Sequence, residues 1–186
     1  MATPGRKMTI SAIVPAAGCG ARAALNGNKI LAPLRDGKSV LFWTLNALRS
    51  AEYAGHELIE IIVVARSEEF AAIEAVKQEC AFSLDFKIVE GGATRQDSVS
   101  NGVSSARGDF VLVHDAARPC LPGEVVARTV ADAQKSGAAI AALPVSDTVK
   151  RSNGAGAIAQ TLDRSEIWLA QTPQVFKRDL FLAALD

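Results

Sequence analysis

Short apolar runs alternate with helix-like stretches along most of the chain. The apolar, β-branched runs cover residues 10–14, 58–65, 86–89, 110–113 and 138–144. The segments between them, at 40–50, 68–81, 97–106 and 123–136, are typical of helices. This alternation predicts an α/β fold with a doubly wound, mostly parallel sheet, Rossmann-like in type. Ligands bind such sheets beyond the carboxyl ends of the strands, so functional residues are expected in the segment after each strand.

The alternation stops after residue 144. Residues 145–162 place the turn sequence of 152–156 between two stretches of alternating polarity, which predicts a β-hairpin. We therefore expect a hairpin arm at about 145–165, protruding from a single domain that covers 1–186. The arm could form a subunit contact or be a surface flap without a partner, and the pattern does not separate these. A short amphipathic helix is expected at 177–185.

Composition narrows the class of protein. The chain has 186 residues, 49% of them hydrophobic, and 20 basic residues balance 20 acidic ones. No basic block predicts nucleic-acid binding, and no apolar run approaches the length that spans a membrane. The first eight residues lack the apolar core of a signal peptide, so a cytoplasmic location is expected. Cys19, Cys80 and Cys120 form no CxxC pair, and reduced thiols are expected.

The first strand ends in a glycine loop. Ala16 and Ala17 lead into Gly18-Cys19-Gly20-Ala21-Arg22-Ala23, which fits the loose GxGxx(G/A) pattern. A dinucleotide site is disfavoured, because Asn26-Gly27-Asn28 interrupts any following helix and no acidic residue ends the second strand. A P-loop is excluded because no GK(S/T) follows. The remaining hypothesis is a loop whose backbone amides, with Arg22 and Lys29, face a polyphosphate; the alternative is two solvated cations.

A second candidate site follows the third strand, at Gly91-Gly92-Ala93-Thr94-Arg95-Gln96-Asp97-Ser98. The glycines permit close approach of the backbone, and Thr94 or Asp97 could cap the next helix. Ser98 could then hydrogen-bond a base or a ribose. The alternative is an ordinary strand–turn–helix junction.

A third candidate site is His114-Asp115-Ala116-Ala117-Arg118-Pro119. A carboxylate at the end of a buried strand is costly unless it is paired, so Asp115 is a candidate Mg²⁺ ligand. Arg118 could bind an anion, or the two residues could simply form an internal ion pair. His114 should face away from Asp115 and is interpreted as a packed core histidine.

Residues on both sides of the hairpin form a fourth cluster. Thr148, Arg164 and Thr172 belong to the segments 147–151, 161–164 and 171–174. Arginines and threonines of this kind could hold a second phosphate-bearing substrate. The alternative is cross-strand charge pairing on an exposed ribbon.

Together these segments resemble the 2-C-methyl-D-erythritol 4-phosphate cytidylyltransferase family of the non-mevalonate isoprenoid pathway. The matching stretches follow the family's order over nearly the whole chain: 14–20, Gly91-Gly92 to Ser98, Val113-His114-Asp115-Ala116-Ala117-Arg118-Pro119, Asp147-Thr148-Val149-Lys150 and Thr172-Pro173-Gln174. The resemblance implies transfer of CMP from CTP to the sugar-alcohol phosphate with release of pyrophosphate. It implies no protein nucleophile, which agrees with a chemistry that depends on positioning and electrostatic stabilisation.

The resemblance also implies roles for individual residues. CTP would be bound by Ala16, Ala17, Gly18, Gly20, Gly92, Arg95, Ser98 and Ala116. Arg22 and Lys29 would stabilise charge on the reacting phosphates, and Asp115 would hold Mg²⁺. The acceptor substrate would contact Asp115, Arg118, Thr148, Arg164 and Thr172. Because the family's arm crosses a dimer, Thr148 and the catalytic Arg164 would serve the neighbouring subunit's site.

The sequence departs from the family pattern at three places. Position 21 is alanine where a basic residue is common, and Asn28 stands where proline is frequent. The family's last strand–helix segment, with an acidic metal-site residue and a substrate-contacting lysine, has no match, so we expect that segment to be missing. Two alternative functions remain open: a ribitol-5-phosphate-type cytidylyltransferase, and a non-catalytic nucleotide-binding or dimerisation module.

Overall fold

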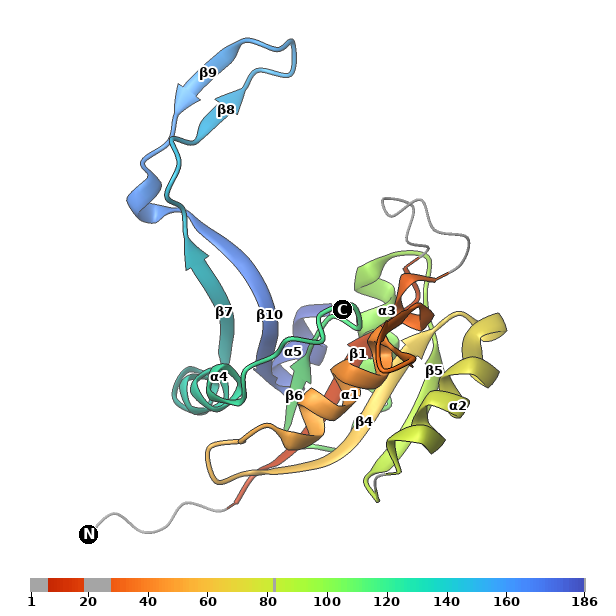
Figure 1. Cartoon of the computed structure of the whole chain (residues 1–186). Helices are drawn as coiled ribbons and strands as arrows, with labels where there is room; N and C mark the ends of the chain where they lie inside the picture. The colour runs from red at the N-terminus through yellow and green to blue at the C-terminus, as the bar shows by residue number, and fades with distance from the viewer. Residues whose placement is uncertain (1–6, 19–27, 82, 186) are drawn as a thin grey trace, which may run out of the picture.

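A six-stranded sheet forms the centre of the molecule (Figure 1), as seen in a computed structural model that describes residues 7–18, 28–81 and 83–185. The strand order is β5-β4-β1-β6-β10-β7. The strands are β1 (Thr9–Pro15), β4 (Glu57–Ala65), β5 (Asp85–Glu90), β6 (Phe110–Val113), β7 (Ala138–Pro144) and β10 (Trp168–Lys177). The pairs β5-β4, β4-β1 and β1-β6 are parallel, whereas β10 is antiparallel to both β6 and β7. The predicted α/β fold with a mostly parallel sheet is confirmed.

The strand–helix alternation is also confirmed. The α-helices of the described part are α1 (Val40–Ser50), α2 (Phe70–Cys80), α3 (Arg95–Ser104), α4 (Gly123–Ser136) and α5 (Arg178–Leu185). Short 3-10 helices, η1 (Lys29–Leu31), η2 (Ser67–Glu69) and η3 (Arg164–Glu166), lie in the connections, as does the small hairpin of β2 (Pro33–Arg35) and β3 (Lys38–Ser39). None of the helices in these ranges is long and apolar enough to cross a membrane.

Two hydrophobic cores cover the two faces of the sheet. On one face Ile10, Ala12 and Val14 of β1 pack with buried residues of α1, α2 and α4. On the other face Ile13 packs with α3, and Phe176 and the apolar residues of α5 complete that layer. Alternate residues of one strand thus enter different cores, which explains why β1 is almost continuously apolar.

The strand β10 is the member of the six-stranded sheet that the sequence pattern did not predict. Its ladder with β7 is interrupted between Ala170 and Gln174, a β-bulge that contains Pro173. A proline within an apolar run argues against a central strand, because it cannot donate a ladder hydrogen bond. The bulge removes that requirement, so β10 lies between β6 and β7 and makes β7 the edge of the sheet.

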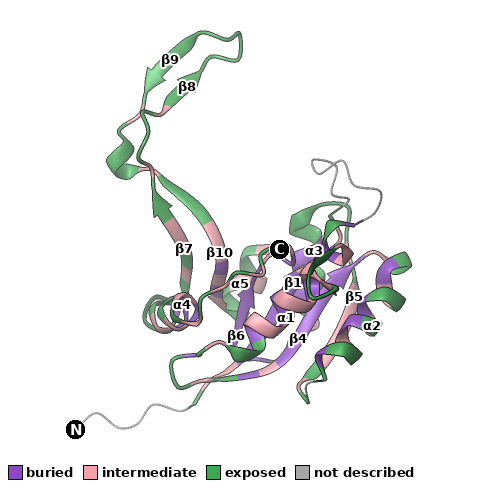
Figure 2. Cartoon of the chain, in the orientation of Figure 1, coloured by how far each residue is buried: buried purple, intermediate pink, exposed green. Residues whose placement is uncertain are grey.

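The predicted hairpin arm is present as β8 (Lys150–Ser152) and β9 (Ile158–Thr161), which pair antiparallel. Its turn is closed by Asn153, whose Oδ1 accepts hydrogen bonds from Ala155 N at 2.9 Å and Ala157 N at 3.2 Å. Figure 1 shows the arm reaching far from the sheet beyond the ends of β7 and β10, and Figure 2 shows it exposed while the central strands are buried. The arm therefore contributes nothing to the core of its own chain.

Candidate functional site

A cavity of about 840 Å³ lies where the parallel strands end. The segments that follow β1, β5 and β6 form its walls, as expected for ligand sites in open α/β sheets. Ten residues predicted to bind nucleotide, metal or substrate line this one cavity: Ala16, Ala17, Gly18, Lys29, Gly92, Arg95, Ser98, Asp115, Ala116 and Arg118. Residues as far apart in the sequence as Ala16 and Arg118 are thus brought together. The predicted residues Gly20 and Arg22 lie outside the described residues.

The first wall is the segment after β1. Ala16 continues the sheet, because its N–H donates to Val64 O at 2.7 Å. On the far side of the loop, Asn28 caps η1, its Oδ1 accepting from Ile30 N at 3.3 Å. The exposed Lys29 begins that short helix and lines the cavity. A cation on a backbone that is capped and tied to the sheet suits the binding of a phosphate.

The second wall is the glycine turn between β5 and α3. A Cβ at Gly91 would lie 2.6 Å from Ala17 Cβ, and a Cβ at Gly92 would collide with Asp97 Cβ. Thr94 and Asp97 form a capping box, which confirms that these residues cap the helix. Only glycine therefore fits the close approach between this turn, the first wall and the start of α3.

Ser98 holds this turn together. Its Oγ donates to Thr94 O at 2.9 Å and accepts from Gly92 N at 3.1 Å. The residue is 4% exposed and borders the cavity. In the structure the hydroxyl thus fixes the position of the Gly92 amide, and its predicted bond to a base or ribose stays a prediction.

The third wall carries Asp115 between two arginines. Its Oδ1 accepts from Arg95 Nη2 at 2.9 Å, and its Oδ2 accepts from Arg118 Nε at 3.0 Å. Burial on its own would raise the pKa of Asp115, but the hydrogen bonds and charges of Arg95 and Arg118 outweigh it and lower that pKa. The internal ion pair of Asp115 with Arg118 that the sequence suggested is present. Arg95, from the second wall, forms a second ion pair with the same carboxylate.

Asp115 carries the only carboxylate among the described residues that line this cavity. The described ranges contain no group of three or more His, Cys, Asp and Glu residues that could hold a metal ion. A Mg²⁺ ion is commonly held by one or two carboxylates together with substrate phosphates and water. An ionised carboxylate offers about four lone-pair sites, so Asp115 retains acceptor capacity beyond its two arginine bonds. The described lining thus offers one carboxylate to a Mg²⁺ ion, and the other ligands of such an ion would have to come from elsewhere.

His114 and Ala116, on either side of Asp115, are fixed by the core. His114 is 1% exposed, and its Nε2 lies 3.0 Å from Arg118 O. Burial lowers the pKa of His114, so the imidazole is neutral at pH 7. This confirms the interpretation of a packed histidine. On the other side, the buried hydroxyl of Thr44 donates to Ala116 O at 2.8 Å and ties this wall to α1.

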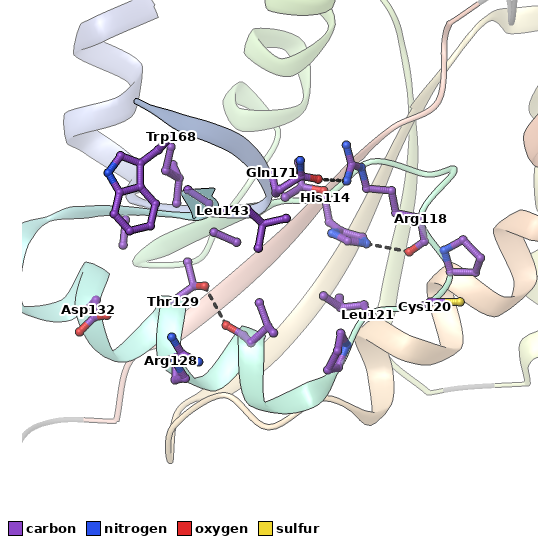
Figure 3. Close-up of a pocket in the computed structure, with 18 residues that line it drawn as sticks. His114, Arg118, Cys120, Leu121, Arg128, Thr129, Asp132, Leu143, Trp168 and Gln171 are labelled. Carbon is purple, nitrogen blue, oxygen red and sulfur yellow. Dashed lines mark hydrogen bonds between the residues drawn. The ribbon is translucent and has the colours of Figure 1, made fainter. Parts of the chain in front are cut away.

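A second cavity, of about 820 Å³, adjoins the first, and Arg118 lines both. Figure 3 shows the carbonyl of Arg118 bonded to His114 and its guanidinium held by Gln171 of β10, whose Oε1 accepts from Arg118 Nη1. Thr172, in the bulge of β10, also lines this cavity, and its Oγ1 accepts from Asp115 N at 3.3 Å. The bulge thus brings the predicted substrate residue Thr172 to the Asp115 segment.

The two predicted substrate residues of the arm are placed elsewhere. Thr148 precedes β8 and Arg164 begins η3, and neither lines either cavity of the described chain. Arg164 Nη1 donates to Ser146 O at 2.6 Å, which fixes the base of the arm. Within one chain these residues are not part of the site.

Three residues around the cavities were missed by the sequence prediction. Gln171 orients Arg118, and Asn28 and Glu69 form a buried hydrogen bond beside the first wall. Asn28 directly precedes the predicted Lys29, and this adjacency could have indicated that Asn28 belongs to the site. Glu69 gave no signal, because a glutamate at the start of an amphipathic helix is normally solvated.

Comparison with known proteins identifies the family. The family model described as 2-C-methyl-D-erythritol 4-phosphate cytidylyltransferase matches residues 10–186. A protein of that name from Syntrophotalea carbinolica is 42% identical over 177 residues, which cover 91% of this chain and 72% of that protein. A bifunctional IspD/IspF enzyme from Anaeromyxobacter is also 42% identical, over 97% of this chain and 46% of its own length.

A solved structure indicates the same family. The crystal structure of 4-diphosphocytidyl-2C-methyl-D-erythritol synthase from Anaerococcus prevotii is similar with a TM-score of 0.80 and 29% identity, over 96% of this chain and 74% of that one. The matched residues include all three walls of the cavity and the arm. The chain therefore belongs to the 2-C-methyl-D-erythritol 4-phosphate cytidylyltransferase family.

Proposed function

We propose that this chain transfers CMP from CTP to 2-C-methyl-D-erythritol 4-phosphate and releases pyrophosphate. One observation supports this proposal most: a single cavity is lined by two glycine-containing segments and by four charged side chains. These side chains are Lys29, Arg95, Asp115 and Arg118. Membership of the family supplies the identity of the substrates. A cavity lined by three cations is suited to a triphosphate.

In the reaction, an oxygen of the acceptor's phosphate attacks the α-phosphorus of CTP. A new P–O bond forms, the bond from the α-phosphorus to the bridging oxygen breaks, and pyrophosphate leaves with that electron pair. No group of the protein needs to form a covalent intermediate. The task of the protein is to align the two anions and to stabilise the charge of the transition state, which a preorganised set of cations does well.

Each wall has a distinct part in this task. The backbone at Gly18 and Gly92 borders the nucleotide, and Lys29 provides positive charge at the phosphates. Arg118 lines both cavities, which supports a role in holding the acceptor's phosphate beside the triphosphate. Its guanidinium is already oriented by Asp115 and Gln171, which reduces the entropy lost on binding.

We further propose that the reaction depends on Mg²⁺ held by Asp115. The ion would neutralise charge on the triphosphate when bound. Asp115 also keeps Arg95 and Arg118 in place, because it accepts a hydrogen bond from each. Its substitution therefore affects the ion and both arginines.

We also propose that two copies associate through the arm. Large apolar side chains are exposed at its base and on β9: Leu143 58%, Ile158 65%, Trp168 58% and Leu169 53% exposed. Exposed apolar groups of this size on a projecting ribbon are typical of an interface. Thr148 and Arg164 would then reach the partner's cavity, which explains why they line no cavity of their own chain.

The dimer proposal can be tested by mixing two variants, each inactive on its own. Lys29→Ala damages the cavity and Arg164→Ala damages the arm. If the arm serves the neighbouring site, mixed dimers contain one intact site and the mixture regains activity. If each arm serves its own chain, the mixture stays inactive.

The catalytic proposal is tested by pyrophosphate release in CTP, Mg²⁺ and 2-C-methyl-D-erythritol 4-phosphate. Lys29→Ala should lower kcat by roughly 10²–10³, the usual loss for one preorganised charge contact. Lys38→Ala is the matched control, because Lys38 pairs with Glu79 at 3.2 Å and lines neither cavity. Equal rates for both variants would contradict the role of Lys29.

A further inference from the structure

The side chain of Asn28 connects three parts of the nucleotide cavity. It is 8% exposed, and its Nδ2 donates to Ala16 O at 2.9 Å and to Glu69 Oε1 at 2.9 Å. Its Oδ1 accepts from Ile30 N at 3.3 Å and so caps the helix that begins with Lys29. One buried amide thus joins the end of β1, the start of η1 and the segment after β4.

Glu69 fixes the orientation of this amide. It is 5% exposed, and the oxygen that accepts from Asn28 also accepts from Arg66 Nη2 at 2.5 Å. A glutamate is normally solvated, and burying its charge is costly unless it is paired and hydrogen-bonded. The Glu69 oxygen accepts from both Arg66 and Asn28, so the NH₂ group of Asn28 faces it, which leaves Oδ1 for the cap of η1.

The backbone conformation of Asn28 is one that a proline could also adopt. Its φ is −77° and its ψ is 120°. This φ lies within the range of roughly −65 ± 15° to which proline is restricted. The hydrogen bonds of the Asn28 side chain thus hold a backbone conformation that a proline ring could also fix.

From this network we infer that Asn28 and Glu69 are positioning residues for the triphosphate, acting through Lys29 and the Ala16 peptide. Both of these groups line the cavity, and the Ala16 peptide cannot turn without breaking its bond to Asn28. The ammonium of Lys29 sits on a flexible stem, so the position of its backbone decides which phosphate it reaches. The inference rests on the proposed function, because it takes CTP as the ligand.

The test measures CTP affinity by isothermal titration calorimetry, with thermal unfolding to show that each variant is folded. Asn28→Ala and Glu69→Ala should each weaken CTP binding by about tenfold, the equivalent of one hydrogen bond to a charged group. Glu69→Gln keeps an acceptor for Asn28 and should restore most of the affinity. The matched control is Glu68→Ala, since Glu68 contacts Arg66 Nη1 at 3.2 Å but not Asn28, and its affinity should equal that of the unsubstituted chain.

A double-variant cycle separates positioning from a merely structural role. Because Asn28 acts in part through Lys29, Asn28→Ala should weaken CTP binding clearly less in the Lys29→Ala chain than in the unsubstituted chain. Losses that multiply, or an Asn28→Ala variant that binds CTP like the Glu68→Ala control, would overturn the inference while leaving the proposed function intact. An unsubstituted chain that binds no CTP would overturn both.

Discussion

Replacing Gly92 by alanine tests whether the second wall depends on close contact. The new Cβ would collide with Asp97 Cβ and lie 3.1 Å from the backbone carbon of the same residue. Neither atom is the free end of a flexible side chain, so the turn and the start of α3 must separate. We therefore expect loss of stability together with loss of nucleotide affinity.

The size of the effect follows from the contacts that would break. Moving Asp97 breaks the capping box, in which Thr94 N donates to Asp97 Oδ2 at 2.9 Å and Asp97 N donates to Thr94 Oγ1 at 3.1 Å. Loss of a cap costs about 1 kcal/mol, and overpacking adds about 1–3 kcal/mol. The sum of about 2–4 kcal/mol corresponds to a fall in Tm of roughly 4–16 °C for a chain of this size.

The assay is urea unfolding followed by circular dichroism, with CTP affinity measured on the same samples. Gly18→Ala is the control for stability, because a Cβ at Gly18 meets nothing within 4 Å of the described chain and its φ is not in the left-handed region. A Gly92→Ala chain within about 0.5 kcal/mol of the parent, the usual range for a surface substitution, would refute this reasoning.

Three further predictions concern stability and pH. Because the pKa of Asp115 is lowered in the folded state, its contribution to stability is complete above the ordinary carboxyl pKa and is lost as pH falls through the folded value; Asp115→Asn should flatten this acid limb in unfolding experiments from neutral to acid pH. Thr44→Val leaves Ala116 O without its buried donor and should cost about 1–3 kcal/mol in urea unfolding, a smaller loss arguing that water replaces the hydroxyl. Leu45→Ala, at a fully buried position, should cost about 2–5 kcal/mol, whereas Leu34→Ala, at a 56% exposed one, should leave the urea midpoint nearly unchanged.

The sequence was most informative where one physical requirement dominates. Buried parallel strands must be apolar on both faces, so their positions could be predicted from hydrophobicity alone. The hairpin arm could be predicted because its turn needs residues such as Gly154, whose φ is +86°. The strand β10 could not be predicted, because Pro173 is accommodated by a β-bulge and no local sequence pattern indicates where a bulge forms.

The site shows the same division. The glycine turns and the Asp115 segment are local motifs, and the rule for parallel sheets brought them to one edge. Contacts between distant segments produce no local sequence pattern. Arg95 and Asp115 are 20 residues apart in the sequence, and Asn28 and Glu69 are 41 residues apart. The pairing of Asp115 with Arg95 and the burial of Glu69 depend on tertiary packing, which a single sequence does not encode in any short pattern.

The acceptor substrate is the most direct test of the account. Pyrophosphate release should be measured on this 186-residue chain with CTP and Mg²⁺, adding 2-C-methyl-D-erythritol 4-phosphate or ribitol 5-phosphate in separate reactions. The proposed function predicts release with the methylerythritol phosphate and only background release with the ribitol phosphate. Release with ribitol 5-phosphate alone, or with neither acceptor while CTP still binds, would contradict it.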